Sequence, residues 1–251
     1  MANPLLDPHA RIVIAHRGNR VAAPENTIEA LRDAIALGAD AVEFDVRVTR
    51  DGVPIILHDP ELDRTTNASG LASELTFAET RAIEVCSPGG DSRFPEARIP
   101  SLEQVLDSIG DVPAVIEVKE ASAVEPTERL IRKFGAAGRV IVGSSGAEVS
   151  ERLYRSELRA CASMRDAVHF IPRALLGITP LPARFAVLSV TPRYHGAPIP
   201  VIRMAVAAHK LGIPTHVWTV NDPGEARRLW AGGVAGIVTD DPGAMIRARM
   251  R

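Results

Sequence analysis

The stretch HRGNRVAAPENTIEALRDAIALGADAVEFDVRVTRDGVPIILH, residues 16–58, decides the fold of this chain. Its centre, Ala41–Val48, alternates strictly between apolar and polar side chains. A period of two predicts a β-strand, with Glu43, Asp45 and Arg47 on one face and only apolar side chains on the other. The apolar face needs a second layer of structure, and the helix-like segments nearby favour helices as that layer over an ordinary antiparallel sheet.

Asp51-Gly52 is a strong signal for a β-hairpin directly after this strand. A two-residue turn at this pair would place Asp45 opposite His58 in a non-hydrogen-bonded position, with Cβ atoms roughly 4.5–5.5 Å apart. It would also put Pro54 opposite Thr49, where its missing N–H is not needed. We therefore expect an antiparallel return arm that brings His58 beside Asp45.

A helix is predicted between the two histidine-bearing segments. Asn26 followed by Glu29 resembles a capping box, and apolar residues then recur at helical spacing until Gly38 ends the helix. This arrangement leaves His16 and Arg17 at the end of the preceding apolar strand, just before a loop.

The remaining sequence repeats the strand-then-helix pattern. Helices are expected near 102–109, with Ser101 as N-cap, and at 124–134, 147–156, 165–176, 201–211, 223–231 and 242–250. Excluding the return arm, the expected strands are Arg11–Ala15, Ala41–Val48, Pro113–Lys119, Arg139–Gly143, Leu158–Ala162, Ala186–Val190, Thr215–Val220 and Gly236–Thr239. Eight such units predict an α/β fold of the closed (β/α)8 or TIM-barrel type, because closure removes the edges of a parallel sheet.

Length and composition fit one barrel domain over residues 1–251, with loop-rich residues 59–100 as a short insertion on one rim after the second strand. A net charge of -2 gives no broad attraction to nucleic acid. No apolar run approaches the roughly 18 residues of a transmembrane segment, and the N-terminus lacks a signal-peptide pattern, so a cytoplasmic location is expected. Cys86 and Cys161 have no metal-binding spacing and are interpreted as ordinary thiols. The sequence leaves open whether the chain forms a homo-oligomer.

Chemically active side chains occur at or near the carboxyl ends of several expected strands. They are His16, Glu43, Asp45, Glu117, Lys119 and Trp218. A lone histidine at a strand end is more often structural than catalytic, and a Glu-x-Asp face is commonly just solvated. In a barrel, however, these strand ends meet at one rim, which is where active sites form. Asp240-Asp241 also lies at a strand end, but Asp241 before Pro242 is a good helix N-cap, and we favour that role.

Five segments together resemble the glycerophosphodiester phosphodiesterase family. They are HRGNRVAAPENTIEAL, GADAVEFDVRVTRDGVPIILHDPELDRTTN, IEVK, HVWTVN and GIVTDDP. The resemblance implies a (β/α)8 barrel that uses a divalent metal to hydrolyse glycerophosphodiesters, such as glycerophosphocholine or glycerophosphoethanolamine, to an alcohol and glycerol 3-phosphate. It places the two catalytic histidines at His16 and His58 and the metal carboxylates at Glu43, Asp45 and Glu117. It further matches Arg17 and Lys119 to phosphate-facing positions and Trp218 to an aromatic residue at the glycerol site.

The chemistry of these side chains agrees with that resemblance. Three carboxylates can hold a hard cation such as Mg²⁺ or Ca²⁺ against a phosphodiester, and two histidines can divide general-base and general-acid work. The sequence does not assign the two histidine roles. Two alternatives remain: a phospholipase D-like enzyme acting on lysophospholipids or sphingomyelin, which would need an exposed apolar rim, and a non-enzymatic barrel that binds a phosphorylated ligand. The aromatic content of 4% gives that rim little support.

Overall fold

A computed structural model describes residues 3–86, 94, 96–178 and 183–250 of the chain. Within these residues, seven strands follow one parallel path in the order β5-β4-β2-β1-β10-β9-β6. Their bounds are β1 Ile12–His16, β2 Ala41–Val48, β4 Ala114–Val118, β5 Val140–Gly143, β6 Leu188–Val190, β9 Thr215–Val217 and β10 Gly236–Thr239.

Residues 160 and 161 close the gap between β5 and β6. Ala160 forms a parallel bridge with Val142, and Cys161 forms one with Val187. Backbone hydrogen bonds of 2.8 Å support both bridges, from Cys161 N to Val142 O and from Ala162 N to Val187 O. The segment predicted as the strand 158–162 therefore completes the ring, and the predicted (β/α)8 barrel is confirmed.

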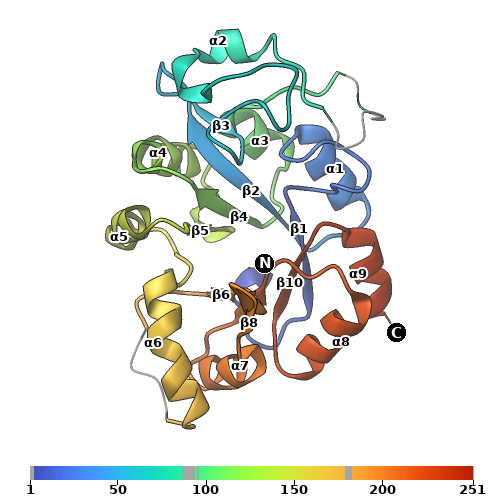
Figure 1. The fold of residues 1–251 in the computed structure, drawn as a ribbon, viewed down its shortest axis with the longest axis vertical. Coiled ribbons are helices and arrows are strands. Elements are labelled where there is room, and N and C mark those ends of the chain that lie inside the picture. The colour runs from blue at the N-terminus through green and yellow to red at the C-terminus, as the bar shows by residue number, and fades with distance from the viewer. Residues whose placement is uncertain (1–2, 87–93, 95, 179–182, 251) are drawn as a thin grey trace.

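The helices lie around the strands, as Figure 1 shows. Their bounds are α1 Ile28–Ala36, α2 Phe77–Thr80, α3 Leu102–Ser108, α4 Val124–Lys133, α5 Ala147–Arg155, α6 Met164–Leu175, α7 Val201–His209, α8 Pro223–Ala231 and α9 Pro242–Arg249. The bounds of α1 and of α3 to α9 agree with the expected helices to within one or two residues. Ser101 caps α3 in a capping box with Gln104, and Asp241 caps α9 by accepting a hydrogen bond from Ala244 N, as predicted.

The two faces of β2 have the separate roles that its alternation predicts. Val42, Phe44 and Val46 are fully buried in one hydrophobic cluster with Leu102 and Leu106 of α3. This packing leaves the intervening Glu43 and Asp45 directed to the inside of the barrel. A different apolar cluster, which includes Leu5, Ile14 and Val238, fills the barrel below them. One face of β2 therefore packs in the hydrophobic core, and its other face presents carboxylates to the inside of the barrel.

The hairpin after β2 has a different register from the one predicted. β3 (Pro54–Ile56) pairs with β2 so that Val46 lies opposite Ile56 and Val48 opposite Pro54. Within the connection between the two strands only Gly52 has a positive φ, 75°, and Gly52 N donates to Thr49 O. The connection is therefore a three-residue loop that ends in a left-handed glycine, because a two-residue type I′ turn would require positive φ at Asp51 as well. The predicted Asp45–His58 pairing is wrong: Leu57 N donates to Asp45 O instead.

The N-cap of α1 also differs from the prediction. Thr27 caps the helix by accepting a hydrogen bond from Ala30 N, while Asn26 has a left-handed backbone, with φ 59°, and is buried. The capping box predicted at Asn26 and Glu29 is therefore wrong. Asn26 is freed from capping and makes contacts inside the barrel mouth.

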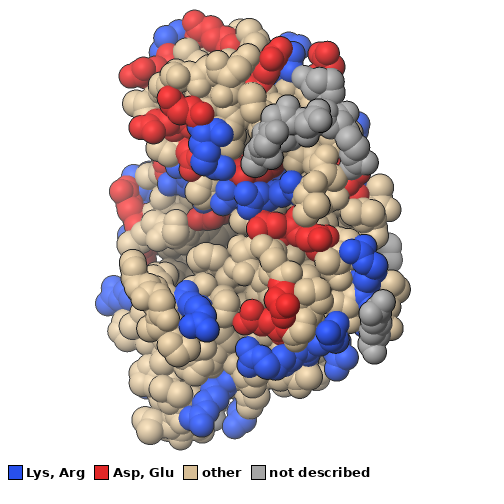
Figure 2. Space-filling model, turned by 45° about the vertical axis from the view of Figure 1, so that its right-hand side comes forward, with Lys and Arg blue, Asp and Glu red and all other residues tan. Residues whose placement is uncertain are grey.

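The rim excursion after β3 has a small core of its own. Ile55, Leu62 and Ile99 are buried there, and η2 (Ala72–Glu74) and α2 lie within it. The PGGD sequence at 88–91, expected as a turn, falls outside the described residues. No helix of the described part of the chain is long and apolar enough to cross a membrane. On the face shown in Figure 2, acidic and basic side chains are interleaved rather than gathered into one basic surface.

Candidate active site

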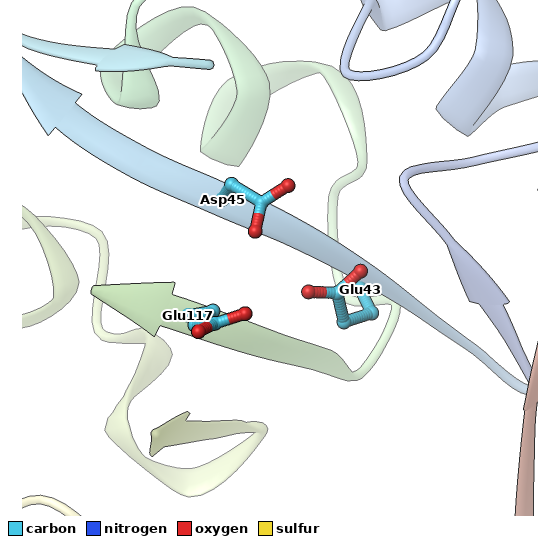
Figure 3. A group of neighbouring side chains, drawn as sticks. All are labelled: Glu43, Asp45 and Glu117. Carbon is cyan, nitrogen blue, oxygen red and sulfur yellow. The ribbon is translucent and has the colours of Figure 1, made fainter. Parts of the chain in front are cut away.

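Three carboxylates meet at the mouth of the barrel. Glu43 and Asp45 come from β2 and Glu117 comes from β4, whose register places Asp45 beside Glu117. Figure 3 shows the three side chains directed toward one another. One oxygen of each lies within 4.8 Å of the others. The structure thus brings together the three residues that the sequence proposed as metal ligands.

Two cations contact this group on the side of Asp45. Lys119 Nζ lies 2.8 Å from Asp45 Oδ1 and 2.7 Å from Glu117 Oε2, and Arg17 Nε lies 3.1 Å from Asp45 Oδ2. The Lys119 side chain is only 8% exposed. Arg17 has a left-handed backbone, with φ 56°, which lets its N–H donate both to Glu43 O and to Glu43 Oε2.

The buried carboxylates have opposite pKa shifts. Burial raises the pKa of Glu43 well above its ordinary value, and the nearby charges of Asp45 and Glu117 raise it further. Burial also opposes ionisation of Asp45, but Lys119, Arg17 and a hydrogen bond from Asn26 bring the pKa of Asp45 below its ordinary value. The nearby positive charges therefore do not offset the cost of ionising Glu43, and a bound cation would stabilise its negative charge.

This donor set fits a hard divalent cation. Carboxylate oxygens from three side chains are the ligands that Mg²⁺ and Ca²⁺ prefer, and no sulfur or imidazole lies in the group. The residues that would hold the ion are Glu43, Asp45 and Glu117, consistent with the sequence-based expectation.

His16 is held at the edge of the carboxylate group by an aspartate. Its Nδ1 lies 2.7 Å from Asp240 Oδ1, and its Nε2 lies 4.0 Å from Glu43 Oε2. Burial alone raises the pKa of Asp240, but hydrogen bonds with His16 and Asn221 bring it below its ordinary value. A persistently charged Asp240 orients the imidazole so that Nε2 faces the mouth of the barrel.

His58 is also held by an aspartate. Its Nδ1 lies 2.6 Å from Asp59 Oδ1, and its side chain is 32% exposed. It follows the end of β3, where its carbonyl oxygen accepts a hydrogen bond from Arg47 Nε. Although the predicted pairing with Asp45 is wrong, His58 still lines the same cavity as His16.

A buried glutamate connects the supports of the two histidines. Glu25 is paired with Arg17 at 2.8 Å, with Arg20 at 2.9 Å and with Arg64 at 2.8 Å. Arg20 also contacts Asp240, and Arg64 contacts Asp59. Burial alone disfavours the charged form of Glu25, but these arginines lower its pKa to about 2.

Apart from Asp240, whose place at a strand end was noted, this supporting layer was not predicted from the sequence. It comprises Arg20, Glu25, Asn26, Asp59, Arg64, Asn221 and Asp240. Asn26 Nδ2 donates to Asp45 Oδ2 at 2.8 Å, and Asn221 Nδ2 donates to Asp240 Oδ2 at 2.8 Å. Two signals were available in the sequence: Asp59 directly follows His58, and Asp240 lies at a strand end beside the N-cap Asp241.

The catalytic candidates border a cavity of about 460 Å³, a size typical of small-molecule sites. Among its lining residues are His16, Arg17, Glu43, His58, Glu117, Lys119 and Trp218. Trp218, which follows β9, is 40% exposed and also lines the cavity. All the site residues predicted from the sequence except the buried Asp45 therefore line one cavity, and Asp45 contacts two of the lining residues, Arg17 and Lys119.

Comparison with known proteins identifies the fold and its relatives. The model of the glycerophosphoryl diester phosphodiesterase family matches residues 16–244. A glycerophosphodiester phosphodiesterase of Caldanaerobacter subterraneus subsp. tengcongensis is 30% identical, with 94% of this chain and 96% of that protein covered. A probable glycerophosphodiester phosphodiesterase 2 of Mycobacterium tuberculosis is 32% identical, with 92% of this chain and 87% of that protein covered. The crystal structure of a glycerophosphoryl diester phosphodiesterase domain from Mycobacterium tuberculosis superimposes with a TM-score of 0.85 at 21% identity, covering 96% of this chain and 99% of that one.

Proposed function

We propose that this chain, which belongs to the glycerophosphoryl diester phosphodiesterase family, hydrolyses glycerophosphodiesters to an alcohol and glycerol 3-phosphate in a reaction that requires a divalent cation. One observation carries the proposal. Two histidines, each oriented by an aspartate, face the same cavity as a group of three carboxylates. A barrel that only bound a phosphorylated ligand would have no need for two oriented proton carriers.

The charged groups suit a phosphodiester anion. A cation held by Glu43, Asp45 and Glu117, either Mg²⁺ or Ca²⁺, would supply Lewis-acid stabilisation of the phosphoryl oxygens. Arg17 and Lys119 add fixed positive charge beside that position, and burial keeps solvent from screening it. Together these groups offset the repulsion between the substrate's negative charge and the carboxylates.

The histidines carry the proton transfers. Each Nδ1 is engaged by a carboxylate, so each Nε2 is the atom left to exchange a proton with the substrate or with water. One histidine accepts the proton of the attacking water, and the other donates a proton to the oxygen of the departing alcohol. Trp218 supports the glycerol moiety through contact with its ring.

The experiment is an assay of glycerophosphocholine hydrolysis with and without excess chelator. We expect choline and glycerol 3-phosphate in equal amounts, loss of the activity on chelation, and recovery with added Mg²⁺ or Ca²⁺. Full activity in excess chelator would refute the metal role of the three carboxylates. Absence of hydrolysis of any diester at saturating metal would refute the enzymatic proposal.

A further inference from the structure

A second cavity, of about 320 Å³, lies beside the catalytic one. It is bordered by the hairpin of β7 (Arg193–Tyr194) and β8 (Ala197–Pro198) and by parts of α7 and α8, which are neighbouring helices of the ring (Figure 1). Of the described residues that line it, only Ile199 also lines the catalytic cavity. Its volume is at the lower end of the range for small-molecule sites.

Three arginines line this second cavity, which we call the arginine cavity. Arg193 comes from the hairpin, Arg203 from α7 and Arg228 from α8. Arg228 lies 3.6 Å from Glu225, the one acidic residue of the described lining. No acidic side chain in the described part of the chain forms an ion pair with Arg193 or Arg203. The lining therefore carries three positive charges against one negative charge, and two of the positive charges have no partner.

The sequence around the hairpin adds to this positive charge. Between Asp166 and Asp222 the chain contains four arginines and one lysine but no aspartate or glutamate. That interval supplies most of α6, the hairpin and α7. An anion near the arginine cavity is therefore attracted by the surrounding segment, although the chain as a whole has a net charge of -2.

The remaining lining of the arginine cavity is apolar. Val201 and Leu229 are buried in its wall, and Ile199, Ile202 and three prolines complete it. Small-molecule sites commonly combine an apolar wall with a few charged groups that orient the ligand. An occupant therefore needs an anionic group for the arginines and an apolar part for this wall.

The β7–β8 hairpin separates the arginine cavity from the catalytic cavity. Arg193 lines the first and its neighbour Tyr194 lines the second, because successive side chains of a strand point to opposite faces. A ligand held by Arg193 would thus contact one side of a hairpin whose other side is a wall of the catalytic cavity.

We propose that the arginine cavity binds a small phosphate monoester with an apolar substituent. Such a group carries a charge between about -1.5 and -2 at neutral pH, which matches the two arginine charges that have no partner. Guanidinium groups also suit it, because their paired N–H donors fit phosphate oxygens. The substituent would lie against Ile199 and Ile202. Binding at this cavity is noncovalent and independent of the proposed hydrolysis.

Calorimetric titration of the metal-free protein with phenyl phosphate measures this binding. Without metal, the three carboxylates at the barrel mouth repel phosphate, so the arginine cavity is the favoured site. We expect one site with a Kd on the order of 0.1–1 mM, and about tenfold weaker binding of inorganic phosphate because it lacks the apolar part. No saturable binding, or equal affinities for the two anions, would overturn the proposal.

Matched substitutions test where the anion binds. Arg203→Gln should weaken the binding of phenyl phosphate about tenfold, and Glu225→Gln should strengthen it about threefold by removing a negative charge from the lining. Arg227→Gln is the control and should change Kd less than twofold, because Arg227 is an exposed arginine of α8 that does not line the cavity. Equal effects of the two arginine substitutions, or weaker binding by Glu225→Gln, would overturn the assignment to this cavity.

Hydrogen exchange tests the contact between the ligand and the hairpin. At a phenyl phosphate concentration ten times Kd, the amides of the paired residues Tyr194 and Ala197 should exchange about tenfold more slowly, because only ligand-free molecules open. Amides of the rim excursion, which does not line the cavity, should exchange at an unchanged rate. Unchanged exchange in the hairpin at this concentration would overturn the contact with Arg193.

Discussion

The Nδ1 atom of His16 lies 2.7 Å from Oδ1 of Asp240, although the two residues are 224 positions apart in the sequence. Parallel pairing of β1 with β10 brings them together, because the barrel aligns the carboxyl ends of both strands. Asp240 is ionised and fixes the imidazole, so the position and the tautomer of His16 depend on the last strand of the fold.

Replacing Asp240 should therefore reduce the chemical step. Asp240→Asn keeps the shape of the side chain but removes the charge that orients His16, and we expect kcat to fall about 10- to 100-fold with little change in KM. The matched control is Asp241→Asn, since asparagine also caps a helix and α9 should be retained. A loss of less than twofold for Asp240→Asn would contradict the positioning role of this residue.

Substituting each histidine in turn should show which one is the general acid and which is the general base. His16→Ala and His58→Ala should each lower kcat on glycerophosphocholine by roughly 10²–10⁴-fold with the fold intact, the usual size of a lost proton-transfer group. A nitrophenyl diester needs little protonation of its departing oxygen, so the histidine that serves as general acid should matter much less with that substrate. His169→Ala, in an exposed histidine of α6, should leave the activity on both substrates near that of the unaltered enzyme. Equal losses for both catalytic histidines on both substrates would favour a shared electrostatic role.

Glu43→Gln should have opposite effects on stability and on metal binding. Because the pKa of folded Glu43 lies well above the ordinary 4.5, the metal-free folded state binds the extra proton, and its stability falls as pH rises through the interval between those two values. An uncharged glutamine avoids this cost, so we expect a melting temperature about 2–6 °C higher at neutral pH without metal, together with weaker Mg²⁺ binding.

Thermal unfolding with and without Mg²⁺, together with calorimetric titration of the metal, would measure both effects of Glu43→Gln. Glu157→Gln serves as the control, because that side chain is 86% exposed and does not belong to the carboxylate group. A metal-free Glu43→Gln variant that melts at a lower temperature than the unaltered protein would show that the ionised carboxylate does not destabilise the metal-free fold.

Glu25→Gln should destabilise the site by removing the partner of three arginines. The pKa of Glu25 falls from its ordinary value of 4.5 to about 2, so its ionisation contributes stability that is present above pH 4.5 and is lost as pH falls toward 2. We expect the free energy of unfolding to drop by about 3 kcal/mol at neutral pH, the amount that such a shift represents. Urea unfolding at neutral pH and near pH 3 checks this, since the difference between variant and parent should shrink at the lower pH. A difference that stays constant between the two pH values would assign the loss to packing rather than to charge.

Local patterns in the sequence were sufficient for the elements and for the residues that carry charge. The alternation of Ala41–Val48 predicted a strand with those same bounds, and Ser101 and Asp241 were identified as helix caps. Carboxylates at the ends of two neighbouring parallel strands were expected to meet, and Glu43, Asp45 and Glu117 do. These features depend on contacts within a few residues or on the general rule that strand ends in a barrel share one rim.

The tertiary structure decided the features for which the local sequence fits more than one arrangement, such as the hairpin register and the cap of α1. The hairpin register followed from contacts of the rim excursion with the turn: Asp51 Oδ1 accepts a hydrogen bond from Phe77 N, and Arg50 N donates to Leu75 O. Asn26 does not cap α1, because its side-chain amide donates a hydrogen bond to the buried carboxylate of Asp45. Thr27 is the cap instead. The pairing of His16 with Asp240 and the contact of Glu25 with Arg64 join residues that are distant in the sequence. The sequence by itself thus determined which side chains lie at the mouth of the barrel, whereas closure of the fold decided the charged partners of His16 and Asp45, because Asp240 and Lys119 come from strands and loops far from them in the chain.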